Sequence, residues 1–290
     1  MRVVVTGGSG RLGGFVIREL LAHGHDVLSL DRVRPAAPPC TAWQVDLTRS
    51  GDVYQALVGA EGVVHLAAYQ APDLAPDTET FTNNVATTYN VLKAAADLRV
   101  PRVVLASSIA AYGFIYAPTL WAPEYLPLDE QHPCQPVDPY GLSKLVGERL
   151  ANAFARLAPL TIASLRLPGI QFDPTYADWA AQRWQQITRR AIGGFFTYID
   201  ARDAAAACRL ALTAPFAGHE VFNVAAPTST MREPTTELLA RYLPPGTRFP
   251  PDRTGNWSAL DSSKAARVLG FEARYGWPQA LPPETLAAPQ

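Results

Sequence analysis

The sequence predicts an α/β protein built on a doubly wound parallel sheet, with helices covering both faces. Short apolar runs rich in β-branched residues alternate with longer amphipathic stretches, which is the pattern of strands and crossover helices. A glycine-rich turn follows the first of these runs directly. Of the 290 residues 48% are hydrophobic, so the chain can bury a full core.

The first half of the chain alternates regularly between the two kinds of element. Residues 3–5 predict a buried strand, and the amphipathic stretch 12–23 predicts a helix that ends at Gly24. The second strand, 27–30, ends at Asp31 and is followed by a Pro- and Ala-rich loop. We then expect strands at residues 42–45, 62–66 and 102–106, separated by helices at 50–58 and 81–98.

The second half contains the last elements of the sheet and a smaller region. A Pro-rich surface loop is expected over 118–139, and no clear strand is visible within 168–191. Between and after these segments we expect helices at 140–157 and 202–212, and strands at 161–165, 196–199 and 221–224. We therefore assign residues 1–167 and 192–227 to the sheet domain, and 168–191 and 228–290 to a small substrate-binding region over the mouth of the sheet.

Charge and composition exclude several classes of partner. The net charge is -1 and no long Lys/Arg run occurs, which argues against a nucleic-acid partner. No run of about 20 apolar residues predicts a membrane span. The chain begins directly on a strand-like run instead of a signal peptide, so we expect a cytoplasmic protein. Cys40, Cys134 and Cys208 are scattered and predict neither disulfides nor a metal site.

The glycine-rich turn indicates a dinucleotide-binding loop of the Rossmann type. It reads G-G-S-G-R-L-G and lies between a predicted strand and a predicted helix. Glycines allow a tight turn and a close approach of the backbone to a pyrophosphate, and the helix N-terminus offers free N–H groups to that anion. We expect the cofactor to contact Gly7, Gly10, Arg11, Leu12 and Gly13.

Acidic residues at the ends of the next two strands favour NAD as the dinucleotide. A carboxylate at Asp31 can accept hydrogen bonds from the adenosine ribose and would repel a 2′-phosphate. Arg32 and Arg34 leave NADP possible, since a guanidinium could hold that phosphate. Asp46 and Leu47 follow the third strand and could meet the adenine, although Asp46 could also serve only as a capping residue.

A tyrosine and a lysine four residues apart predict the proton-transfer machinery. Tyr140 and Lys144 lie one turn apart on one face of the predicted helix. A neighbouring ammonium favours the phenolate, so we expect Lys144 to lower the pKa of Tyr140 and also to hydrogen-bond a ribose. Ser108 follows the fifth strand and could hold the substrate oxygen beside Tyr140.

These pieces together resemble the extended short-chain dehydrogenase/reductase family, in its NAD-dependent epimerase/dehydratase group. The matching segments follow the family order over about the first 200 residues: 6–13, Asp31, Asp46-Leu47, 65–68, 84–85, 90–92, 107–113, 139–144, Arg166, 198–200 and Asp203. The resemblance implies a Rossmann-type fold, a bound NAD(P), and Ser108, Tyr140 and Lys144 as the catalytic set.

The resemblance also implies further contacts and an assembly. It places Leu66, Ala67, Ala68, Pro168 and Ile170 along the cofactor. Asn84 would order the site and belong to the cofactor-binding set. Helices near 83–98 and 140–157 would form a homodimer through a four-helix bundle.

Departures from the family pattern narrow the substrate. Ile109 and Ala110 stand where 4,6-dehydratases of the family carry Asp and Glu, and neither can act as an acid or base. Gly169 stands where nucleotide-sugar epimerases usually carry Asn. The chain therefore looks more like the smaller members that oxidise free sugars or other small hydroxy compounds, such as uronate dehydrogenases. In that case residues 172–190 cover the substrate, with Arg183 as an anchor for a carboxylate and Tyr69 as a further contact.

Three functional hypotheses remain from the sequence. The leading one is hydride transfer between NAD(P) and a secondary alcohol or hemiacetal of a small sugar-like or hydroxy substrate. The same residues could instead return the hydride to the other face, which would make the protein an NAD-dependent sugar or nucleotide-sugar epimerase. A non-catalytic NAD(P)-sensing regulator is the hypothesis from another class, although such proteins typically lose the Tyr or the Lys.

Overall fold

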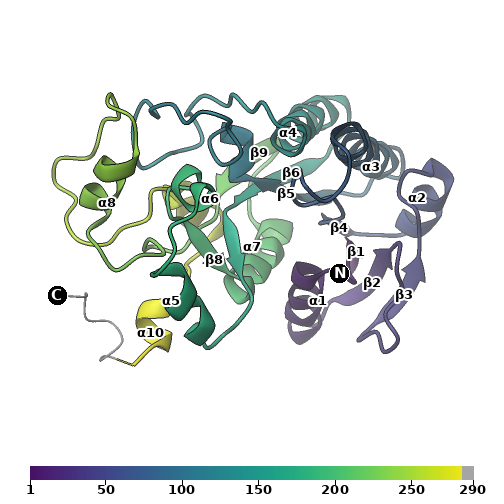
Figure 1. The fold of residues 1–290 in the computed structure, drawn as a ribbon. Helices are drawn as coiled ribbons and strands as arrows, with labels where there is room; N and C mark the ends of the chain where they lie inside the picture. The colour runs from purple at the N-terminus through teal and green to yellow at the C-terminus, as the bar shows by residue number, and fades with distance from the viewer. Residues whose placement is uncertain (283–290) are drawn as a thin grey trace.

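The structure is a computed structural model that describes residues 1–282, without the side chains of residues 178, 180 and 181. Its centre is a seven-stranded parallel sheet in the order β3-β2-β1-β4-β5-β6-β9 (Figure 1). The strands are β1 (Arg2–Thr6), β2 (Asp26–Asp31), β3 (Thr41–Gln44), β4 (Gly62–His65), β5 (Arg102–Ser108), β6 (Thr161–Leu167) and β9 (His219–Asn223). The predicted doubly wound fold is therefore confirmed.

The strand order reverses at β1, and this creates the position for a ligand. Val3 pairs with Val27 of β2 on one side and with Gly62 of β4 on the other. The chain runs outward through β2 and β3, then returns to β4 and continues through β5, β6 and β9. A crevice opens at the carboxyl ends of the strands at such a switch point, because the neighbouring connections leave in opposite directions.

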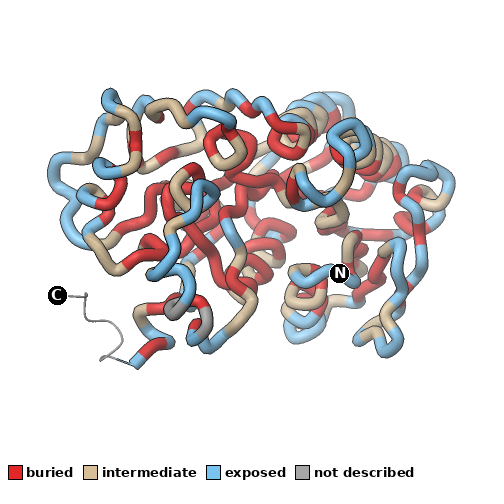
Figure 2. The backbone as a smooth tube through the Cα atoms, viewed as in Figure 1, coloured by how far each residue is buried: buried red, intermediate tan, exposed pale blue. Residues whose placement is uncertain are grey.

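Alternate residues of the buried strands pack on opposite faces of the sheet. Val3 and Val5 join the core under α1 (Arg11–Ala22) and α7 (Ala201–Thr213), whereas Val4 joins the core on the other face. That second face is covered by α2 (Ser50–Leu57), α3 (Asp77–Asp97) and α4 (Pro139–Leu157). Figure 2 shows that most of the central strands are buried between these two layers.

The smaller region extends from the carboxyl side of the sheet. It contains the two-stranded parallel sheet of β7 (Gly169–Gln171) and β8 (Tyr198–Asp200), with α5 (Ala177–Arg183), α6 (Arg189–Gly193), α8 (Thr235–Tyr242) and α10 (Trp277–Ala280). Of these elements, β8 lies within residues 192–227, which the sequence analysis assigned to the sheet domain. A short 3-10 helix, η1 (Ile109–Tyr112), follows β5. The helix α9 (Ser263–Leu269) instead packs against α7 and β9, although the sequence assigns 228–290 to the smaller region. Residues 283–290 of that assignment lie outside the described residues.

Several observed elements differ from those predicted. The helix α3 begins at Asp77, about a turn before residue 81, and places Asp77 and Glu79 in its first turn, where carboxylates interact favourably with the helix dipole. The strand β5 continues to Ser108, two residues beyond the predicted end. The strand β7 was not predicted, because three residues paired only with β8 are too few to give a periodic pattern.

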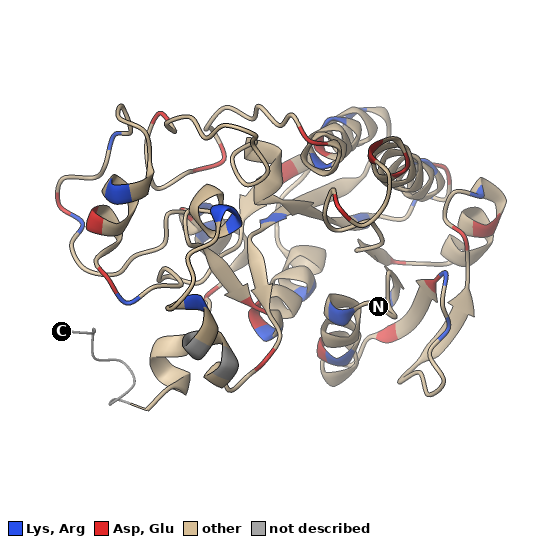
Figure 3. Ribbon diagram, in the orientation of Figure 1, with Lys and Arg blue, Asp and Glu red and all other residues tan. Residues whose placement is uncertain are grey.

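Charged residues are spread over the molecule instead of being gathered on one element. Figure 3 shows acidic and basic residues interspersed along the ribbon, with basic residues on both α5 and α6. Within residues 1–282, no helix combines the length and the apolar character that crossing a membrane requires.

Candidate active site

A cleft of about 550 Å³ opens at the carboxyl ends of the sheet strands. It is lined by every predicted site residue except Asn84: Gly7, Gly10, Arg11, Leu12, Gly13, Asp31, Arg32, Asp46, Leu47, Leu66, Ala67, Ala68, Tyr69, Ser108, Tyr140, Lys144, Pro168, Ile170 and Arg183. Residues from six different connections after strands therefore meet around one space. This convergence depends on the parallel sheet, since parallel strands bring all their carboxyl ends to one edge.

The glycine turn is packed too closely to accept side chains. Gly7 has φ +71, and a Cβ on it would lie 2.8 Å from the backbone nitrogen of Ala67. A Cβ on Gly13 would lie 2.2 Å from the carbonyl oxygen of Gly7. Gly10 is the N-cap of α1 and supplies no side-chain hydrogen bond, so the first N–H groups of the helix face the cleft without a side-chain cap.

The acidic residues near this turn are already engaged with the backbone. The two carboxylate oxygens of Asp31 accept hydrogen bonds from the N–H groups of Ser9 (3.0 Å) and Val33 (3.2 Å). Asp46 accepts hydrogen bonds from the N–H and hydroxyl of Thr48, which lower the pKa of Asp46. Each carboxylate oxygen has a second lone pair, so these contacts fix Asp31 in position and leave acceptor capacity toward the cleft.

Tyr140, Lys144 and Ser108 come together on the floor of the cleft. The side chain of Asp138 caps α4 by accepting from Gly141 N (2.8 Å), which sets Tyr140 in the first turn. Lys144 Nζ lies 5.4 Å from the centre of the Tyr140 ring and donates to the carbonyl oxygen of Ala106 (2.7 Å). Ser108 hydrogen-bonds Tyr140 and also accepts from Ala110 N (3.1 Å).

The electrostatics of this group differ from the expectation. Burial raises the pKa of Tyr140, and the hydrogen bond with Ser108 only partly opposes this effect. The predicted lowering of this pKa by Lys144 is not found, because desolvation dominates and the Lys144 ammonium directs its hydrogen bond to the carbonyl oxygen of Ala106. Burial also lowers the pKa of Lys144 to about 8, although the charge of Glu148 acts in the opposite direction.

Asn84 was expected to bind the cofactor, but it lies behind the wall of the cleft. Its side chain is 3% exposed and pairs with the backbone of Tyr69, accepting from Tyr69 N (2.8 Å) and donating to Tyr69 O (3.0 Å). It also donates to Ser143 Oγ (3.2 Å) on α4. Asn84 therefore fixes the segment after β4 to α4, and its neighbour Asn83 lines the cleft instead.

Arginines and aromatic rings also lie in or next to the cleft. Arg183 is exposed, and its guanidinium lies 4.9 Å from the centre of the Trp179 ring. Among the side chains that the structure describes, no Asp or Glu lies within ion-pair distance of Arg183. Arg190 lies 4.9 Å from the centre of the Tyr116 ring and forms a 3.5 Å ion pair with Asp73.

Tyr116 and Arg190 line the cleft but were not among the predicted site residues. Tyr116 lies in the segment after η1, where no periodic pattern or motif marks it. The aromatic and basic composition of 172–190 was a usable signal for Arg190, but only the fold selects it among the neighbouring arginines.

No metal site is apparent in the described part of the chain. Residues 1–282 contain no group of three or more His, Cys, Asp or Glu side chains that could hold a metal ion. The three cysteines are free thiols, with Cys208 buried and Cys40 and Cys134 half-buried.

The sequence profile of the NAD dependent epimerase/dehydratase family matches residues 3–170, more than half of the chain. The chain belongs to this family. The match includes the glycine turn, the end of β5 and the helix with Tyr140 and Lys144, so the predicted resemblance is confirmed.

Relatives within the epimerase/dehydratase family include both epimerases and dehydrogenases. UDP-glucose 4-epimerase of Lactobacillus helveticus is 32% identical over 162 residues, which cover 52% of this chain and 46% of the relative. L-arabinose 1-dehydrogenase (NAD(P)(+)) of Haloferax volcanii is 33% identical over 172 residues, which cover 57% of this chain and 66% of the relative. The matched stretch spans about half the length of the curated epimerases.

A solved structure extends the similarity to almost the whole chain. A short-chain dehydrogenase/reductase superfamily protein from Agrobacterium tumefaciens, with bound NAD, has a TM-score of 0.72 and 26% identity. The similarity covers 99% of this chain and 96% of that one. The smaller region of this epimerase/dehydratase family member is therefore part of a shared architecture.

Proposed function

We propose that this protein is an NAD-dependent oxidoreductase that transfers hydride between NAD and a secondary alcohol or hemiacetal carbon of a small sugar-like or hydroxy substrate. The observation that carries the proposal is the gathering of Ser108, Tyr140 and Lys144 in the cleft that also contains the glycine turn. Membership of the epimerase/dehydratase family supports it.

The glycine turn fits a dinucleotide. A Cβ on Gly7 or Gly13 would meet backbone atoms, so the backbone approaches the cleft as closely as a pyrophosphate requires. Asp31 would accept from the ribose hydroxyls and favour NAD. NADP is the alternative, because the guanidinium of Arg32 lies 5.2 Å from the Tyr69 ring at the same end of the cleft.

The residues on the cleft floor have different roles in the proton transfer. In the oxidation direction, Tyr140 takes the proton of the substrate hydroxyl, and Ser108 holds the substrate oxygen. Bound NAD⁺ supplies the hydride acceptor and a positive ring. Because burial raises the pKa of Tyr140, the phenolate depends on positive charge nearby, and Lys144 is the cationic side chain placed to supply it.

The substrate end of the cleft suits an acidic hydroxy compound. Arg183 faces the cleft without a carboxylate partner among the described side chains, and a guanidinium binds a carboxylate in a bidentate manner. Ile109 and Ala110 are buried in η1 and carry no acid or base, so dehydration through these positions is excluded. A uronate-like substrate satisfies both observations.

The closest alternative is a sugar or nucleotide-sugar epimerase that uses the same residues. It is favoured by the UDP-glucose 4-epimerases among the relatives. The two activities differ in cofactor use, since a dehydrogenase consumes free NAD stoichiometrically and an epimerase keeps its cofactor and gives no net reduction. A dinucleotide-sensing regulator would instead show binding with no turnover.

The test is a screen of the purified protein with NAD⁺ and NADP⁺ against free uronates, aldoses, hydroxy acids and UDP-sugars. Reduction is followed by the absorbance of the reduced cofactor, and epimer formation by chromatography. Tyr140→Phe should lower kcat by about 10²–10⁴, the usual contribution of a general base. Tyr275→Phe is the matched control, because this tyrosine is 41% exposed, does not line the cleft and should leave kcat nearly unchanged. Turnover by Tyr140→Phe at the wild-type rate would refute the assignment.

We also propose a homodimer formed through α3 and α4. These helices pack along each other, and their outer sides expose apolar side chains that include Tyr89 (45% exposed) and Leu142 (37% exposed). Leu142→Glu should then convert a dimer into a monomer in light-scattering measurements of mass.

A further inference from the structure

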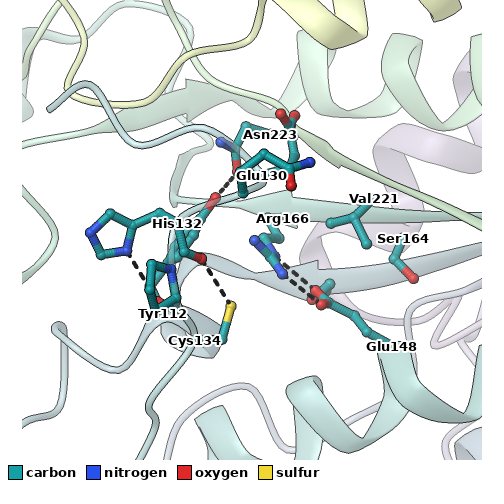
Figure 4. A network of polar contacts seen from close by, with 12 residues as sticks. Tyr112, Glu130, His132, Cys134, Glu148, Ser164, Arg166, Val221 and Asn223 are labelled. Carbon is teal, nitrogen blue, oxygen red and sulfur yellow. Dashed lines mark hydrogen bonds and ion pairs between the residues drawn. The ribbon is translucent and has the colours of Figure 1, made fainter. Parts of the chain in front are cut away.

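A buried ion pair lies beneath the floor of the cleft. Glu148 of α4 accepts two hydrogen bonds from Arg166 of β6, one from Nε to Oε1 (2.9 Å) and one from Nη2 to Oε2 (2.8 Å). The two residues are 5% and 4% exposed. Figure 4 shows the two side chains facing each other between the helix and the strand. A bidentate contact of this kind fixes the plane of the carboxylate as well as its position.

The carboxylate of Glu148 also reaches the active-site wall. Ser107 Oγ donates to Glu148 Oε1 at 2.6 Å. Ser107 and Ser108 are the last two residues of β5, and both line the cleft. Glu148 follows Lys144 by one helical turn and Tyr140 by two, so it lies on the helix face that carries them. One side chain therefore contacts the strand that carries Ser108 and shares a face with the other two catalytic candidates.

Arg166 is itself held from the opposite side. Its guanidinium lies 4.5 Å from the centre of the Tyr112 ring. The Tyr112 hydroxyl donates to Asn223 Oδ1 (2.8 Å) on β9, and Asn223 N donates to Glu130 Oε1 (2.7 Å). The contacts in Figure 4 thus connect α4, β6 and β9 with the loop that contains Glu130. Glu148 cannot turn away from the cleft without breaking contacts on several elements.

Stability alone is a weak explanation for this arrangement. A buried ion pair loses hydration on folding, and well-packed apolar residues of similar size are often as stable. A charge held rigidly beside a proton-transfer group has a second effect, because it determines which protonation state that group adopts.

The charged groups around Lys144 can be named from every side. His65 faces it from β4 and stays neutral, because burial lowers the pKa of His65 to about 3. Tyr140 faces it from α4 and is also neutral in the free protein, since burial raises its pKa. Glu148 therefore remains as the formal charge that acts on Lys144 within the described chain. Arg166 and His219 in turn face Glu148, from β6 and β9.

We propose that Glu148 is a positioning residue of the active site: held by Arg166, it aligns the Ser107–Ser108 end of β5 and keeps the Lys144 side chain protonated in the cleft. The kinetic consequence rests on the proposed function. The effect on Lys144 does not, because it concerns the free protein.

The direct test is an NMR titration of Lys144 in the free protein. The chain has only three lysines, Lys93, Lys144 and Lys264, so ¹³C-labelled lysine gives three side-chain signals, and Lys144→Arg identifies one of them. The wild-type protein should titrate Lys144 with a pKa of about 8. Glu148→Gln should lower this midpoint, whereas Glu148→Asp, which retains the charge, should bring it back toward the wild-type value. Ser107→Ala is the matched control, because it removes the hydrogen bond from Ser107 Oγ to Glu148 Oε1 and leaves every charge in place, so it should leave the midpoint unchanged.

A second variant separates the proposal from a failure to fold. Glu148→Gln leaves the cation of Arg166 buried without its carboxylate, and this is destabilising. Glu148→Gln/Arg166→Gln removes both charges, and its Lys144 midpoint should be lowered as in the single variant, because Glu148 is the charge that acts on Lys144. A Lys144 midpoint equal to that of the wild type in both folded variants would overturn the proposal.

Kinetics test the positioning itself. With a substrate found in the screen, Glu148→Gln should lower kcat by up to about 10²-fold, because a small misplacement of reacting groups is costly even when the substitution lies behind them. The alkaline limb of the kcat/KM profile should move to lower pH, because the Lys144 ammonium is lost earlier. An alkaline limb at the wild-type pH would refute the role. If no substrate turns over while the Lys144 midpoint still shifts, the proposed function fails and the electrostatic inference stands.

Discussion

Replacing Gly7 by alanine tests whether the glycine turn is shaped for a dinucleotide. Gly7 has φ +71, and a Cβ there would lie 2.8 Å from Ala67 N, 3.0 Å from Ala67 Cα and 3.0 Å from the carbonyl carbon of Leu66. All three are backbone atoms, so no side-chain rotation relieves the overlap. The turn or the segment after β4 must move, and both line the cleft.

Two effects contribute to the expected loss, and a second glycine separates them. A left-handed backbone costs an L-residue roughly 1–2 kcal/mol. Gly24 has φ +74, but a Cβ on it would meet nothing within 4 Å. Gly24→Ala should therefore lower the free energy of unfolding by roughly 1–2 kcal/mol and leave cofactor affinity intact. Gly7→Ala should lose more stability than this, because the overlap adds to the backbone strain.

The assay combines urea unfolding of both variants with calorimetric titration of NAD⁺. We expect Gly7→Ala to weaken NAD⁺ binding by at least about tenfold, which corresponds to about 1.4 kcal/mol. Equal unfolding free energies for the two variants, together with wild-type NAD⁺ affinity in Gly7→Ala, would show that the close approach of the turn to Ala67 does not shape the binding site.

Three further predictions address the remaining groups of the site. The free energy of unfolding should fall as the pH drops below about 6.5, because the unfolded chain protonates His65 while the folded chain resists until about pH 3. Urea titrations of His65→Gln should show a flatter pH dependence between these values, and an unchanged slope contradicts the burial argument. Arg183→Ala should raise KM for acidic substrates about tenfold or more and spare neutral ones, since a charge-assisted contact is lost; equal KM values for acidic substrates would end its assignment as an anchor. Asp31→Ala should raise kcat/KM for NADP⁺ relative to NAD⁺ by removing a repelling carboxylate, and an unchanged ratio argues that Asp31 does not face the ribose.

The dinucleotide loop and the Tyr140–Lys144 pair could be predicted because each depends on neighbouring residues. A glycine turn between a strand and a helix is visible in the chain order, and four-residue spacing puts two side chains on one helix face. The alternation of strands and helices then predicted a parallel sheet, and a parallel sheet brings strand ends together. From these features the sequence predicted a set of site residues, and all of them except Asn84 line one cleft in the structure.

Contacts between distant segments could not be predicted in this way. Asn84 turned out to hold Tyr69 and Ser143 behind the wall, because its direction depends on how α3 packs against α4. Tyr116 reaches the cleft from a loop with no sequence pattern. The contact of Glu148 with Ser107 joins residues that are 41 positions apart.

The chain alone predicted the fold class from its periodicity and the family from the motifs that resemble it, and both predictions are confirmed. The protonation of Tyr140 and Lys144 depends on the tertiary structure. A lysine one turn from Tyr140 predicts a lowered phenol pKa, yet enclosure by the cleft walls raises it. Desolvation is a property of everything packed around a group, so it appears only when α4, β5 and their neighbours are in place.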